Sequence, residues 1–223
     1  MGLYDDYSKK AGGADPAGER NNPKPGKVWV IINECAAGVN KNPKGGYVGK
    51  VWTKVGCVVL RTFEPGGCQS HGLSETGQPQ PKCSGPHAPG DAHDHLFQDG
   101  VLQNENRHKA FLMTVFGLEK HQVTGEVFDM CITNAQPMRN IVLEVNTATE
   151  ATQTDKKKWI HKSSAGRRVA ATEVQAVLDQ LAPAARAELA RDGRLEKMLK
   201  QEEGEARAKA ASLAAAAAAG QTK

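Results

Sequence analysis

Cysteine and histidine side chains that could bind a metal gather in one stretch of the chain, residues 68–95. This stretch holds two of the five cysteines and four of the seven histidines. Thiol and imidazole groups placed in two short chelating loops are typical ligands of tetrahedral zinc. The ligands predicted by the spacing C-x2-H-x11-C-x3-H are Cys68, His71, Cys83 and His87. A structural zinc would hold this long polar loop in place through the free energy of metal binding.

The same stretch fits two other interpretations. It could be a polar surface loop without metal, or His93 and His95 could supplement the ligands of a catalytic metal. The sequence contains no glycine-rich phosphate loop, no G-x-S-x-G and no H-E-x-x-H to complete an enzyme. Cys35 lies in a strand-like segment, where a cysteine is usually a small apolar residue rather than a nucleophile. We therefore expect no catalytic residues, and no cofactor beyond this one predicted zinc.

The elements that would position this stretch are apolar and strand-like. Their β-branched and aromatic residues favour strands, and the links between them are short and carry glycine, proline or asparagine. The predicted strands lie within residues 27–33, 47–63, 110–116, 123–133 and 138–146. A helix over 107–120 is the alternative. Five strands with short links predict a mainly β fold, a small antiparallel β-sandwich or partial barrel.

Composition divides the chain into four parts. Residues 1–26 are rich in glycine and proline and predict an extended N-terminal arm. Residues 27–146 form the predicted β-domain, with a Cys/His-rich loop at 64–100. Residues 147–168 read as a basic linker, and residues 169–223 as a C-terminal α-helical extension. The arm could be disordered, or it could dock on a neighbour through its apolar tip residues, Leu3, Tyr4 and Tyr7.

A helical period begins near Ala171. Apolar residues recur there at the spacing of one helix face: Val174, Val177, Leu178 and Leu181. Pro183 either kinks this helix or starts the next one. Further on, Glu196 and Lys200 are spaced to pair across one helical turn. The alanine-rich end of the chain favours a helix but offers little to bury, which is typical of an element that packs on a partner.

The positive charge of the chain is concentrated in one patch. Residues 155–168 carry a net charge of +5, against +4 for all 223 residues. The basic residues of the patch, together with one tryptophan, are Lys156, Lys157, Lys158, Trp159, Lys162, Arg167 and Arg168. Such a patch suits an acidic surface such as tubulin, RNA or anionic lipid, although it could also be a solvated linker. We predict these residues and the arm tip as partner-binding.

No targeting or membrane-spanning pattern is visible. The first twenty residues lack an apolar signal region, and no apolar run approaches the roughly 20 residues that span a bilayer. We expect a cytoplasmic protein, with the cytoskeleton or a cilium favoured, that is not an enzyme. The favoured function is a structural subunit of a large assembly, docked on other protein subunits through its arms and basic patch. The alternatives are a zinc-stabilised binding module or metalloenzyme, and a ribosome- or RNA-associated protein.

Overall fold

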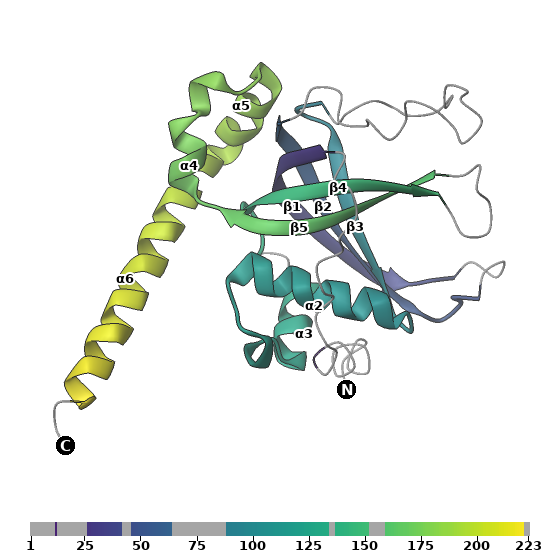
Figure 1. Cartoon of the computed structure of the whole chain (residues 1–223), viewed down its shortest axis with the longest axis horizontal. Coiled ribbons are helices and arrows are strands. Elements are labelled where there is room, and N and C mark those ends of the chain that lie inside the picture. The colour runs from purple at the N-terminus through teal and green to yellow at the C-terminus, as the bar shows by residue number, and fades with distance from the viewer. Residues whose placement is uncertain are drawn as a thin grey trace.

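A single antiparallel sheet forms the centre of the molecule. The computed structural model describes Gly12 and residues 26–41, 46–63, 88–133, 137–151 and 159–220. Within these residues five strands pair in the order β3-β2-β1-β4-β5 (Figure 1). The strands are β1 (Gly26–Val39), β2 (Val51–Thr62), β3 (Ala92–Gln98), β4 (Val142–Ala151) and β5 (Trp159–Val169). The predicted antiparallel sheet of five strands is confirmed, although two of the strands come from other segments.

Helices lie on both faces of the sheet. Helices α2 (Leu102–Phe116) and α3 (Gly125–Thr133), with the short 3-10 turn η2 (Lys120–Gln122), are inserted between β3 and β4. The chain ends in a second helical group: α4 (Ala171–Ala176), η3 (Leu178–Gln180), α5 (Pro183–Ala190), η4 (Arg191–Gly193) and α6 (Arg194–Gly220). Pro183 lies in the first turn of α5, where its missing N–H costs nothing. The predicted C-terminal helical extension is therefore confirmed.

Strand β1 supplies side chains to two separate cores. Successive residues of a strand point to opposite faces. Val28, Val30 and Ile32 pack with residues of α2 and α3 in one cluster. Trp29 and Ile31 pack on the other face, in a second cluster formed with α4, α5 and α6. The fold is thus a three-layer arrangement with the sheet in the middle (Figure 1).

Two segments predicted as strands are helical. Residues 110–116 belong to α2 and residues 123–133 largely to α3. The buried apolar side chains of α2 follow the spacing of one helix face: Phe111, Leu112 and Val115. Gly117 ends α2 with φ of 64°, a left-handed C-cap that glycine adopts without strain. The short apolar runs fit a buried strand as well as a buried helix, so the predicted strands are wrong and the alternative helix over 107–120 is supported.

Two strands come from segments predicted as irregular. Strand β3 lies inside the Cys/His-rich loop 64–100, and β5 takes up the end of the basic linker 147–168. In β3 every second residue is buried, but two of these buried residues are histidines, which a hydropathy pattern counts as polar. Strand β5 is an edge strand and is polar on its exposed positions. Neither strand therefore shows an apolar alternation in the sequence.

The sheet does not close on itself, since β3 and β5 form its two edges. The second sheet of a sandwich is not found in the described ranges, where helices cover both faces. The same ranges contain no helix whose length and hydrophobicity would let it cross a membrane.

Candidate interaction site

The predicted zinc ligands lie outside the described residues. This holds for all four of them: Cys68, His71, Cys83 and His87. His93 and His95 are described, and they face the buried side of β3 rather than solvent. In the ranges that the structure describes, no three histidine, cysteine or acidic residues gather as a metal site. The proposal of zinc therefore concerns the segment between β2 and β3 alone.

Metal analysis tests that proposal directly. We predict that the purified protein carries about one equivalent of zinc, because four such ligands complete a tetrahedral site. The double variant Cys68→Ser, Cys83→Ser should lose the metal. Cys35→Ala is the matched control, since Cys35 lies on β1 outside the loop, and it should retain zinc. Elemental analysis after dialysis is the measurement, and wild-type protein without zinc would refute the proposal.

A buried group of histidine and phenylalanine rings joins β3 to α2. The ring of His108 stacks on Phe97 at 4.1 Å between centroids, with 9° between the planes. It also meets the ring of Phe128 edge-on at 4.9 Å. The ring of His95 lies 5.1 Å from Phe111. These histidines are therefore part of the core between sheet and helix, where their rings pack like those of phenylalanine.

Burial keeps these histidines neutral. His108 is fully buried and His95 is 5% exposed. Burial lowers the pKa of His108 to about 3. Burial also lowers the pKa of His95 to about 3, assisted by the nearby His93, Arg107 and His108. At neutral pH both rings are therefore uncharged. They supply no positive charge that could attract an acidic partner.

The described cysteines are protonated at neutral pH. Burial, and then the charge of Glu34, raises the pKa of the Cys35 thiol to about 11. Burial raises the pKa of Cys131 to about 12, and it also raises that of Cys57. The thiolate is the reactive form of cysteine, so these thiols are poor nucleophiles. This agrees with the interpretation of Cys35 as a small apolar residue.

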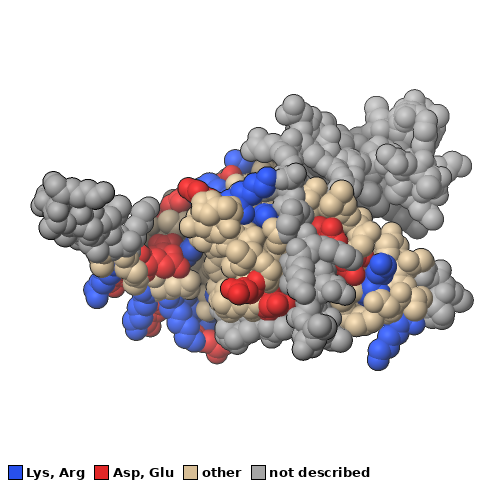
Figure 2. All heavy atoms as spheres, turned by 90° about the horizontal axis from the view of Figure 1, so that it is seen from below, with Lys and Arg blue, Asp and Glu red and all other residues tan. Residues whose placement is uncertain are grey.

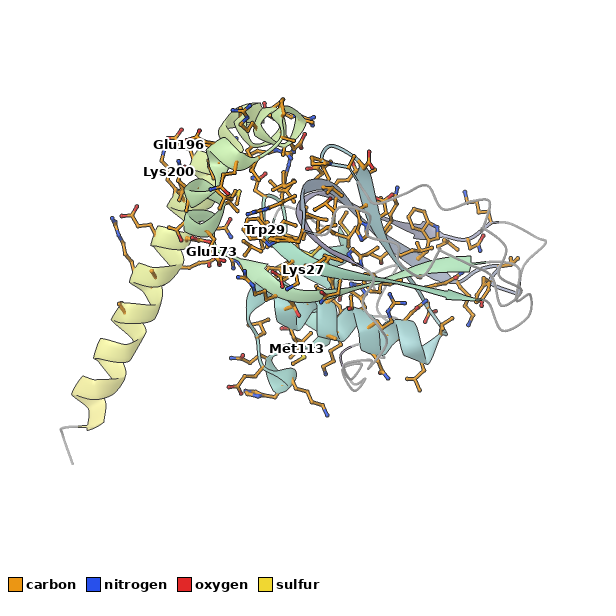
Figure 3. All side chains as sticks on the ribbon, turned by 45° about the horizontal axis from the view of Figure 1, so that its top comes forward. Lys27, Trp29, Met113, Glu173, Glu196 and Lys200 are labelled. Carbon is orange, nitrogen blue, oxygen red and sulfur yellow. The ribbon has the colours of Figure 1, made fainter. Side chains whose placement is uncertain are left out.

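Arg167 of the predicted basic patch is engaged within the molecule. Its two terminal nitrogens donate to the carboxylate of Glu173 on α4 at 2.8 and 2.9 Å. Its Nε lies 3.5 Å from Glu144 on β4, which also pairs with Lys27 at 3.1 Å. These hydrogen bonds lower the pKa of Glu173, whose carboxylate also accepts from the backbone N–H of Ala170. Figure 3 shows Glu173 where the C-terminal helices meet the sheet.

Arg168 is engaged as well. It pairs with Glu205 on α6 at 3.0 Å. The two arginines thus attach the C-terminal helices to β5, which reduces their part in binding a partner. Trp159 and Lys162 lie in β5, but their side chains are outside the described part. The remaining predicted partner-binding residues fall outside the described ranges altogether: Lys156, Lys157, Lys158, Leu3, Tyr4 and Tyr7.

The base of α6 is fixed to the body of the molecule by three kinds of contact. Met198 is buried in the core on the outer face of the sheet, with Leu195 and Leu199 packed beside it. The Glu202 carboxylate accepts a hydrogen bond from the backbone N–H of Ala171, which caps α4. The ion pair of Arg168 with Glu205 is the third contact. Sequence reasoning missed the last two contacts, because they join residues more than thirty positions apart.

Beyond Glu205, α6 leaves the body of the protein. The described side chains from Ala206 to Ala211 are exposed. The helix is 27 residues long, so its residues 206–220 extend it by about 22 Å at 1.5 Å per residue. Figure 1 shows α6 projecting away from both layers of the fold. In Figure 2 basic and acidic side chains alternate at the end of the molecule from which α6 projects.

A buried ion pair fixes the turn between α5 and α6. The guanidinium of Arg194 at the start of α6 donates to Glu188 on α5 and to Asn33 on β1. The side chains of Arg194 and Glu188 are 3% and 6% exposed. Glu188 also pairs with Arg191 at 2.7 Å. One arginine at the first residue of α6 thus joins the start of this helix to α5 and to the central strand.

Comparison with family models, with curated proteins and with solved structures finds no match to this chain.

Proposed function

We propose that this chain is a non-catalytic structural subunit of a large assembly and that it docks through the projecting part of α6. The observation that carries the proposal is the contrast between the two halves of this helix. Its first half is tied to the body by burial, a helix cap and ion pairs, whereas the described residues that follow Glu205 are exposed. A helix held at its base and exposed beyond it is arranged to present a surface to a neighbour.

The composition of the projecting half supports this role. Between residues 206 and 220 it carries Arg207 and Lys209 but no acidic residue, and most of the rest is alanine. Alanine has the highest helix propensity, so the segment continues a helix that the body has already nucleated. Small side chains also let another backbone approach closely. The i,i+4 pairs Glu196–Lys200 and Glu203–Arg207 support the helix in solvent.

Among acidic assemblies we propose the microtubule lattice. The net charge of the predicted patch and of the projecting half of α6 is positive, and tubulin presents an acidic surface. Arg167 and Arg168 take part in internal ion pairs, so the contact would rest on Lys156, Lys157, Lys158 and on α6. Binding of this kind weakens as salt rises, because ions screen exposed charges.

Sedimentation of native extracts tests whether the chain binds microtubules and whether it does so through the projecting part of α6. We expect the full chain to pellet with polymerised microtubules and to stay in the supernatant after cold depolymerisation. A chain ending at Glu205 should stay in the supernatant in both cases while keeping its stability, because the described residues beyond this point are exposed. Lys200→Gln on the exposed face of the helix base is the matched control and should pellet like wild type (Figure 3).

Two results would contradict the proposal in different ways. If the full chain stays in the supernatant but elutes from a sizing column within a large complex, the microtubule is the wrong assembly. If it elutes at the size of its 23.9 kDa monomer, the proposal of a structural subunit fails.

A further inference from the structure

A groove beside α3 has one wall that comes from the N-terminal region of the chain. The groove has a volume of about 700 Å³. Its described lining consists of Gly12, Lys109 on α2, Lys120 and His121 on η2, and Val123, Thr124 and Gly125 at the start of α3. Gly12 is far from these residues in sequence, since it lies 97 positions from the nearest of them, Lys109. Gly12 is thus in contact with the layer formed by α2 and α3.

Two backbone contacts hold Gly12 in this place. The Lys109 ammonium donates a hydrogen bond to the carbonyl oxygen of Gly12 at 2.5 Å. Lys109 is 4% exposed, and a buried ammonium is costly unless it donates hydrogen bonds. On the other side, the backbone of Gly12 lies directly against the backbone at Thr124 and Gly125. The contact therefore involves no side chain of residue 12.

A residue with a side chain at position 12 would displace neighbouring backbone atoms. A Cβ atom built on Gly12 would lie 2.7 Å from the backbone nitrogen of Gly125 and 3.2 Å from the carbonyl carbon of Thr124. Both neighbours are backbone atoms at the start of a helix, so neither can rotate aside as a side chain would. Gly204 on α6 offers a comparison, because a Cβ built there meets nothing within 4 Å.

We propose that this face of α2, η2 and α3 is a binding site for the chain's own N-terminal arm and that it recognises the arm through a glycine at position 12. Thirteen residues separate Gly12 from the start of β1. At about 3.3 Å per residue they can span at most roughly 43 Å. The proposed site would hold the arm at residue 12, and the predicted tip residues Leu3, Tyr4 and Tyr7 precede this position in the sequence.

Hydrogen exchange of the full-length protein, followed by mass spectrometry, tests this site. The amides of peptic fragments that contain residue 12 should exchange at least about tenfold more slowly than those of the same segment in a free synthetic peptide of residues 1–25. Slow exchange reports how rarely a segment leaves its contacts. Gly12→Ala and Lys109→Met should each remove most of that protection. Gly204→Ala is the matched control, because it makes the same substitution at a helical glycine with open space, and protection should be unchanged.

Three outcomes would overturn the proposal. The first is exchange of the wild-type segment as fast as that of the free peptide. The second is full protection in Gly12→Ala while the exchange of α2 and α3 remains as in wild type. The third is protection that rises with protein concentration, since it would show that the arm of a second copy fills the site. None of these outcomes depends on α6 or on its partner, so the test is independent of the proposed function.

Discussion

Lowering the pH from 7 to 4 is expected to unfold the protein cooperatively. The pKa values of His95 and His108 are about 3 in the folded chain, against 6.5 for an unperturbed histidine. Between these values the unfolded chain binds more protons than the folded one, so the free energy of unfolding falls as the pH falls through this window. Well above pH 6.5 both rings are neutral in either state, and their contribution to stability is at its full value.

The size of this effect is comparable with the whole stability of a domain. At pH 4.5 each histidine lies about two pH units below its unfolded pKa, which corresponds to roughly 2.7 kcal/mol per residue. Two residues together cost about 5 kcal/mol, against a typical total of about 5 to 15 kcal/mol. We therefore expect the free energy of unfolding, measured by urea unfolding, to be about 5 kcal/mol lower at pH 4.5 than at pH 7, and circular dichroism to show an acid-unfolding transition below pH 6.5.

One substitution separates the histidines from the carboxylates, which also titrate in this range. His108→Phe keeps an aromatic ring between Phe97 and Phe128 but removes the proton, so the midpoint should fall by roughly half a pH unit or more. Leu96→Phe is the matched control, because Leu96 is 57% exposed on β3 and the change introduces a phenylalanine without removing a titratable group, so its midpoint should equal that of wild type. If His108→Phe overpacks the site, His95→Gln provides a second test. Unchanged midpoints in both core variants would contradict the explanation.

Removing Arg194 is expected to cost about 3 kcal/mol or more in the free energy of unfolding. Glu188 would be left as a buried carboxylate, and breaking one partner of a buried pair typically costs about 3 to 5 kcal/mol. Asn33 would lose its hydrogen-bond donor as well. The remaining pair of Glu188 with Arg191 offsets part of this cost. Urea unfolding of Arg194→Met, compared with wild type, measures the loss in the free energy of unfolding.

A double variant distinguishes charge burial from lost packing. Glu188→Gln in the Arg194→Met background removes the orphaned charge and should restore more than half of the lost stability. Arg191→Met alone should cost less than about 1 kcal/mol, because the Arg191 side chain is 57% exposed and the buried Glu188 keeps its pair with Arg194. If Arg191→Met proved as damaging as Arg194→Met, the central role of Arg194 would be excluded.

The parts of the fold that sequence reasoning predicts correctly are those in which local pattern and packing agree. In β1 and β2 the β-branched residues are both good strand formers and core residues, so the pattern is unambiguous. The pairing of Glu196 with Lys200 was also predictable, and the structure confirms it at 2.7 Å. In α2 and α3 the packing is helical although the short apolar runs resemble strands. There the tertiary contacts decide, and sequence alone could not.

The candidate site shows the same limit. The alanine-rich composition of the C-terminal helix was visible in the sequence and indicated an element with little to bury. The groups that orient it were not visible, because the bond between Arg194 and Asn33 joins residues 161 positions apart. The roles of Arg167 and Arg168 likewise depend on which acids the fold brings near them. A run of basic residues therefore predicts an exposed basic patch only where the fold brings no acidic side chain of the same chain close enough to pair with it.

The topology of the sheet also determines how it would carry mechanical load. Both β1 and β5 are antiparallel to β4, so they run parallel to each other on either side of it. The arm enters at Gly26, which is paired with Thr147, and the C-terminal helices leave after Val169, which is paired with Val142. Tension between the two ends would pull these strands in opposite directions along their axes. The hydrogen bonds on both sides of β4 would then be strained together in shear rather than one at a time, a geometry suited to a tether.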